Sequence, residues 1–195
     1  YSYLFSDRWT GGAALKIIYS KLADYSSVAL AVDLGLNYFD EEQDLSASLS
    51  VQNIGTQVKA YDDGMKTHLP FTLTLGFSKG FDHLPVRIHA AFTDVTRWKS
   101  NYYALPDADS KKVKFGSKLL NHFVVGLDIL PTNYLYIAAG YNFRRAYELK
   151  ASGSSKMAGL SFGAGIDLKG FKFGLSYARY HLAASSIMGS LAYSF

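Results

Sequence analysis

The chain lacks cysteine altogether and holds only four prolines in 195 residues. The absence of cysteine excludes a disulfide framework, a thiol nucleophile and a cysteine-based zinc site. No apolar run approaches the about 18–20 residues that a membrane-spanning helix needs. The chain also has little excess of one charge sign over the other, because the formal net charge is only +4 at pH 7. A balance this small does not indicate nucleic acid as a partner.

Aromatic residues and glycine are plentiful instead, with 15 Tyr, 13 Phe and 17 Gly. Aromatic side chains favour strands over helices. No change of composition divides the chain, so we expect residues 1–195 to form a single domain. The first five residues, Tyr1–Phe5, resemble the end of a strand that is already under way. We therefore expect the chain to be the C-terminal portion of a longer protein.

Alternation of apolar with small or hydroxylated residues is the dominant pattern. In 186–195, Ile187, Leu191 and Tyr193 share one face of a strand, and Ser186, Ser190 and Ser194 share the other. The same pattern predicts about ten strands, with a remnant of another before Trp9. The expected strands are 9–22, 27–38, 45–52, 71–78, 86–93, 122–129, 135–143, 159–167, 171–178 and 186–195, with 53–55 ending the third.

Two regularities favour a transmembrane antiparallel β-barrel over a soluble sandwich, which would explain the alternation alone. The connections alternate between short ones (40–44, 80–84, 131–133, 169–170) and long loops (54–68, 96–118, 147–155), as in outer-membrane barrels with short periplasmic turns. Aromatic residues of the apolar face also gather near strand ends, which suggests two interfacial girdles. The members are Tyr38, Phe71, Phe77, Phe92, Phe123, Phe143, Phe171, Tyr193 and Phe195.

Ionisable residues on the polar face are the natural candidates for chemistry: Lys16, Asp33, Arg87, His89, His122, Asp128, Asp167 and Lys172. One interpretation is an acid–base site, for instance His122 with Asp128. The interpretation that we prefer is a polar barrel interior with compensating charges. No Gly-x-Ser-x-Gly elbow and no His-x-x-x-His spacing occurs. We expect no enzymatic activity, no cofactor and no metal.

The long loops are basic and partly aromatic. This mixture suits the phosphates of lipopolysaccharide or an acidic protein partner, and it equally suits a plain solvated loop surface. The candidate interface residues are Arg97, Trp98, Lys99, Tyr102, Tyr103, Lys111, Lys112, Lys114, Arg144 and Arg145.

Four stretches carry a family resemblance: Asn53-Ile-Gly-Thr-Gln-Val-Lys59, Leu69-Pro-Phe-Thr-Leu-Thr-Leu-Gly-Phe-Ser-Lys79, His83-Leu-Pro-Val-Arg-Ile-His89 and Thr96-Arg-Trp98. With them the chain resembles the PorV/PorQ family, outer-membrane subunits of the type IX secretion system of Bacteroidetes that are related to FadL-like barrels. The resemblance implies a barrel of about 14 strands whose first strands lie upstream.

The resemblance also implies a non-enzymatic role at the cell surface. Such a subunit anchors an attachment complex, with a PorZ-like extracellular protein and PorU/PorV-like subunits as partners, which joins secreted cargo to anionic lipopolysaccharide. The alternative function is that of a FadL-like channel for a hydrophobic solute. The polar Ser, Thr, Asp and Lys side chains of the inner face count against an apolar path for such a solute.

Overall fold

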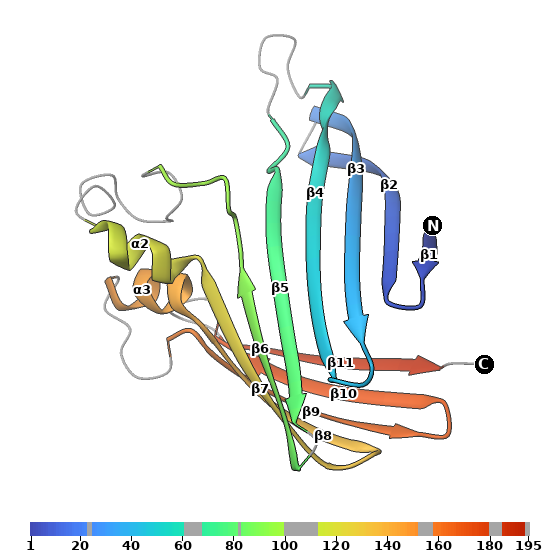
Figure 1. Cartoon of the computed structure of the whole chain (residues 1–195). Helices are drawn as coiled ribbons and strands as arrows, with labels where there is room; N and C mark the ends of the chain where they lie inside the picture. Colours follow the sequence, from blue (N-terminus) through green and yellow to red (C-terminus); the bar gives the residue numbers. More distant parts are fainter. Residues whose placement is uncertain are drawn as a thin grey trace.

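The computed structural model describes residues 1–22, 25–60, 68–81, 83–99, 113–151, 158–179 and 185–193. These residues form one antiparallel sheet of eleven strands, and each strand pairs with its neighbour in the sequence (Figure 1). The strands are β1 (Ser2–Ser6), β2 (Trp9–Leu22), β3 (Tyr25–Asp40), β4 (Leu45–Lys59), β5 (Thr72–Phe81), β6 (Leu84–Phe92), β7 (Phe123–Thr132), β8 (Leu135–Asn142), β9 (Leu160–Leu168), β10 (Phe171–Ala178) and β11 (Ser186–Tyr193). The all-β class, with ten strands and a remnant before Trp9, is confirmed.

The strand register keeps most of the apolar residues of the strands on one face. On β10, for example, Phe173 lies opposite Ile166 of β9 and Leu191 of β11. A slip of one residue would turn every side chain of a strand to the other face, so the alternating sequence fixes the register. The sheet therefore has one apolar face and one face of small and polar residues.

The sheet is a single layer. The hydrophobic residues that are buried in the described chain are Ala29, Ala31, Leu149 and Ala178. Large apolar side chains stay exposed instead, among them Leu30, Leu49, Ile88 and Leu175. No second sheet packs on this apolar face within the described residues. The soluble sandwich considered above is therefore not the architecture of this sheet.

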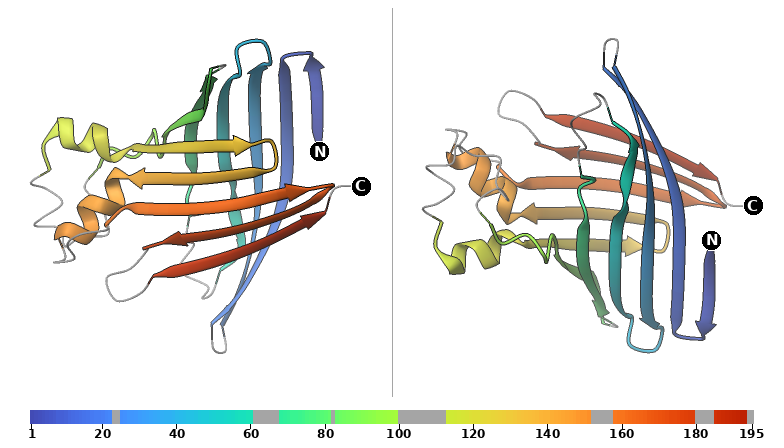
Figure 2. Two further views of the ribbon diagram at one scale, coloured as in Figure 1. Left: turned by 90° about the horizontal axis from the view of Figure 1, so that it is seen from below. Right: turned by 90° about the horizontal axis from the view of Figure 1, so that it is seen from above.

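The sheet is strongly twisted, as the right-handed twist of strands requires. The axes of β2–β5 are roughly aligned with one another, and the axes of β8–β11 cross them at a steep angle (Figures 1 and 2). The outer strands are β1, which pairs with β2, and β11, which pairs with β10.

Three short turns and the two helical links lie at opposite ends of the strands, and the two-residue link from β2 to β3 shares the helical end. β3 and β4, β7 and β8, and β9 and β10 are joined by short turns at one end. At the other end the link from β6 to β7 contains helix α2 (Phe115–Asn121), and the link from β8 to β9 contains helix α3 (Phe143–Ala151). The two helices lie beside each other beyond the ends of the strands (Figures 1 and 2). No described helix is long and apolar enough to cross a bilayer.

The expected end of the third strand at 53–55 is wrong, because β4 continues to Lys59. Asn53 adopts a left-handed backbone (φ 58°), and the register with β3 shifts between Val32 and Leu34. The Asn53 N–H donates to Asp33 Oδ1 at 2.9 Å, and its side-chain amide donates to the Pro70 carbonyl at 3.0 Å. The residue that resembles a strand terminator is thus a β-bulge inside a longer strand.

Several further boundaries differ from the prediction. The loops expected at 96–118 and 147–155 overlap helices, and Phe143 begins α3 instead of ending β8. Pro131 and Thr132 belong to β7, so the turn expected at 131–133 lies at 133–134 instead. His122, expected on the polar face of a strand, forms the C-cap of α2.

Candidate interaction surface at the helical end of the sheet

The ionisable side chains of the polar face form ion pairs. Lys16 pairs with Asp33, and His89 Nε2 lies 2.7 Å from Asp128 Oδ2. Arg87 Nη2 contacts both oxygens of Asp44 at 3.0 Å, and Lys172 Nζ lies 3.3 Å from Asp167. The pairing of His122 with Asp128 is wrong, because His89 is the histidine beside Asp128. This arrangement agrees with the interpretation of compensating charges.

The short-turn end carries a further ion pair. Arg8 Nη1 lies 3.1 Å from Oδ2 of Asp40, whose side chain is almost fully buried. The Tyr38 hydroxyl donates to the same oxygen at 3.3 Å. The hydrogen bond with Tyr38 and the charge of Asp40 raise the pKa of the Arg8 guanidinium. Arg8 therefore stays charged and ties the β1–β2 turn to the end of β3.

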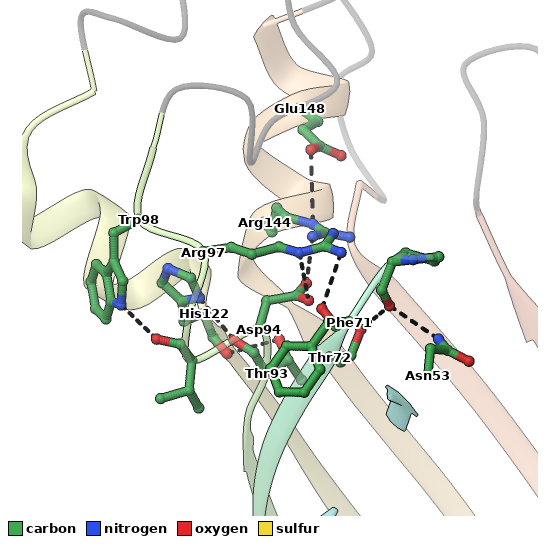
Figure 3. A network of polar contacts seen from close by, with 12 residues as sticks. Asn53, Phe71, Thr72, Thr93, Asp94, Arg97, Trp98, His122, Arg144 and Glu148 are labelled. Carbon is green, nitrogen blue, oxygen red and sulfur yellow. Dashed lines mark hydrogen bonds and ion pairs between the residues drawn. The ribbon is translucent and has the colours of Figure 1, made fainter. Parts of the chain in front are cut away.

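A polar network around Asp94 occupies the opposite, helical end of the sheet (Figure 3). Asp94 follows β6 and is buried, with 9% of its surface exposed. Arg144 Nη1 of α3 lies 3.0 Å from Asp94 Oδ2, and Arg97 Nε lies 3.8 Å from Asp94 Oδ1. Arg97 Nη2 also donates to the Phe71 carbonyl at 3.1 Å, and Arg144 Nε lies 3.8 Å from Glu148. One carboxylate thus joins the link after β6, the segment before β5 and helix α3.

Local turn chemistry places these groups. Asp94 has a left-handed backbone (φ 53°), which Asp tolerates better than most residues. The Arg97 N–H donates to the Asp94 carbonyl at 2.8 Å and closes a turn. The side chain of Asn142 accepts a hydrogen bond from the Arg145 N–H at 2.9 Å, which satisfies one of the free donors at the start of α3. Arg144, on that first turn, therefore faces Asp94.

An aromatic cluster lies beside this network. Trp98 Nε1 donates to the Val95 carbonyl at 2.6 Å, and its ring lies 4.4 Å from that of His122. His122 is completely buried and donates through Nδ1 to the Thr93 carbonyl at 2.8 Å. Phe92 contacts both rings, with centroid distances of 6.1 Å to Trp98 and 5.5 Å to His122. His122 therefore joins the C-terminal end of α2 to the end of β6.

The structure divides the predicted interface residues into three groups. Arg97, Arg144 and Trp98 are engaged inside the chain by the contacts above, and Arg145 is half-buried on α3. Lys99 and Lys114 are exposed. Tyr102, Tyr103, Lys111 and Lys112 lie outside the described residues. Contact of these residues with a partner or with lipopolysaccharide stays a prediction.

Sequence reasoning did not single out Asp94, Phe115 or the capping role of His122. Asp94 follows the strand Leu84–Phe92, and an Asp beyond a strand end is a common turn signal, which could have indicated it. The described residues contain no group of three or more His, Asp or Glu side chains placed to hold a metal ion. Comparison with known proteins finds no family model that matches the chain and no curated protein with significant similarity to it.

Proposed function

We propose that this chain forms part of a transmembrane β-barrel in a bacterial outer membrane. The observation that carries the proposal is the single-layer sheet, whose apolar face exposes large side chains on strand after strand. Exposed apolar areas of this extent mark a membrane or protein contact rather than a water-facing surface. The opposite face bears hydroxyls, glycines and ion pairs, as the interior of a membrane barrel does.

Strand lengths and connections support the same proposal. Apart from β1, the strands contain 8 to 16 residues, where a tilted membrane strand needs about 9–11. The short turns then face the periplasm, and α2 and α3 lie on the extracellular side. Bilayers admit sheets only when their backbone groups are paired, and every strand from β2 to β10 has a neighbour on both sides.

For the role of the barrel we propose a non-enzymatic, PorQ-like subunit of the type IX secretion system. Its extracellular segments would anchor a cell-surface attachment complex with PorZ-like and PorU/PorV-like partners. The support is the resemblance of residues 53–59, 69–79, 83–89 and 96–98 to that family. A FadL-like channel for a hydrophobic solute is the second candidate. The ion pairs Lys16–Asp33 and His89–Asp128 favour the subunit, because a charged lumen does not suit an apolar solute.

Membrane insertion is tested by placing a charge on each face of one strand. Leu175 of β10 is 62% exposed on the apolar face, and the next residue, Ser176, points to the polar face. Leu175→Arg should make insertion into lipid vesicles less favourable by about 2–4 kcal/mol if the site lies near the bilayer midplane. Ser176→Arg is the matched control and should change it little. Equal effects of the two substitutions would contradict the membrane proposal.

The proposed role is tested by affinity purification of the native protein from outer membranes. Co-purification of large surface proteins, reduced by Lys111→Glu with Lys112→Glu, supports the anchoring role. The purified barrel without partners should take up no fatty acid when reconstituted in vesicles. Uptake of fatty acid together with an absence of co-purifying surface proteins would favour the channel.

A further inference from the structure

Helix α2 exposes all three of its large apolar side chains. Phe115 is 73% exposed, Leu120 is 53% exposed and Leu119 is 39% exposed, while the buried residue of this helix is the polar Asn121. A surface helix normally turns its apolar side chains towards the protein. The reversed arrangement in α2 indicates that these side chains have an apolar partner outside the described chain.

Lysines surround this apolar group. Lys114, immediately before α2, and Lys99, next to Trp98, are both exposed. Lys118 lies in the last turn of the helix and donates to the Trp98 carbonyl at 3.1 Å. Helix α2 itself contains no acidic residue, and the nearby Asp94 and Glu148 are paired with Arg144. We call Lys99, Lys114, Phe115, Lys118, Leu119 and Leu120 the α2 patch.

A continuous row of aromatic rings joins the α2 patch to the apolar face of the sheet. Phe123 of β7 and Phe92 of β6 lie opposite each other on that face, with ring centroids 4.9 Å apart. Phe92 lies 6.1 Å from Trp98, and Trp98 stacks on Phe115 at 5.9 Å with an angle of 19° between the rings. Whatever apolar medium covers the sheet at β6 and β7 can therefore extend to α2.

We propose that the α2 patch binds the phosphate-bearing headgroup layer of the lipid leaflet on the helical side of the barrel. Phe115, Leu119 and Leu120 enter the boundary between headgroups and acyl chains, and Lys99 and Lys114 bind lipid phosphates. This inference rests on the proposed membrane barrel. Continuity with the apolar face favours lipid over an acidic protein, because a protein partner would not require that connection.

The two tryptophans of the chain allow the inference and the proposed function to be tested separately. Trp9 lies on the apolar face at the short-turn end, 5.1 Å from Tyr38, and Trp98 lies at the helical end. Trp9→Phe leaves Trp98 as the fluorescent reporter, and Trp98→Phe leaves Trp9. Each protein is reconstituted in phosphatidylcholine or phosphatidylglycerol vesicles that contain lipids brominated close to the headgroup.

We expect both tryptophans to be quenched, and Trp98 more strongly in the anionic vesicles. Lys99→Glu with Lys114→Glu should remove that difference for Trp98, and Phe115→Ser with Leu120→Ser should reduce its quenching in both lipids. Neither pair of substitutions should change the quenching of Trp9.

Absence of quenching at both tryptophans would overturn the membrane barrel itself. Quenching of Trp9 without Trp98 would overturn only the α2 patch as a lipid site and would favour a soluble acidic protein. Equal quenching of Trp98 in both lipids, unchanged by the lysine substitutions, would overturn the role of lipid phosphate.

Discussion

The contact between Tyr136 and Gly165 illustrates how single residues shape this sheet. The two residues lie directly opposite each other on β8 and β9. The tyrosine ring lies so close over Gly165 that a Cβ at this position would overlap ring atoms, and the hydroxyl reaches towards Gly174 of β10. An aromatic ring that covers a cross-strand glycine shields backbone that would otherwise lack side-chain cover. Gly165 is therefore required for close approach of the ring.

Gly165→Ala should destabilise the protein by about 1–3 kcal/mol, because the ring or the backbone must move away from the new methyl group. Gly35→Ala is the matched control, since a Cβ at Gly35 of β3 meets no atom within 4 Å. Unfolding by urea in detergent micelles measures both. In a protein that already carries Tyr136→Ala, the further substitution Gly165→Ala should destabilise less than it does when the tyrosine ring is present. Equal losses for Gly165→Ala and Gly35→Ala would refute the packing argument.

At the scale of elements, the Asp94 network fixes α3 and the link after β6 to the end of the sheet. Asp94→Asn should destabilise the protein by about 1–3 kcal/mol, because it leaves the half-buried Arg144 without its close carboxylate. Asparagine keeps the tolerance for a left-handed backbone, so the substitution tests the charge alone. Increased proteolysis within 93–122 and 143–159 should accompany the loss of stability.

The control for this prediction is Asp167→Asn. Asp167 and Lys172 form an ion pair in which both side chains are about half exposed. Exposed pairs contribute little to stability, about 0–1 kcal/mol, so this substitution should leave the unfolding midpoint almost unchanged. An Asp94→Asn protein as stable as the Asp167→Asn protein would show that the network is not what holds the helical end.

The sequence predicted the strands well and the helical end poorly, for one physical reason. Alternation with a period of two is visible in the local sequence of each strand. Leu30, Leu127 and Phe173 could therefore be assigned to the apolar face without knowledge of the neighbouring strands. The helices are short, α2 with seven residues and α3 with nine, and their stability comes from contacts distant in sequence. The pairing of Arg144 with Asp94 spans 50 residues, which no local pattern reports.

The prediction of a strand end at Asn53 failed for a related reason. Asn53 and Gly55 are typical turn residues, and only the contacts of Asn53 with Asp33 and Pro70 make this stretch a kink within a strand. The sequence did place Lys99 and Lys114 on an exposed basic surface. It also grouped Arg97 and Arg144 with them, because composition does not distinguish an exposed arginine from one that a carboxylate holds inside the chain.

At the scale of the whole molecule, the exposed apolar face controls how the protein behaves in solution. Transfer of the purified protein from micelles to detergent-free buffer should cause self-association, because the apolar side chains of the sheet would then face water. Sedimentation velocity in the two media measures this. A monodisperse monomer in detergent-free buffer, with its strand content retained in the far-ultraviolet circular dichroism spectrum, would rule out the membrane sheet.

Eleven is an odd number, and this has a consequence for how the two outer strands can meet. In a sheet of antiparallel neighbours every second strand points the same way, so β1 and β11 have equal polarity. Joined directly, they would form the one parallel seam in an otherwise alternating cylinder. A cylinder that alternates all the way round must insert an odd count of extra strands between them, be it one, three or five.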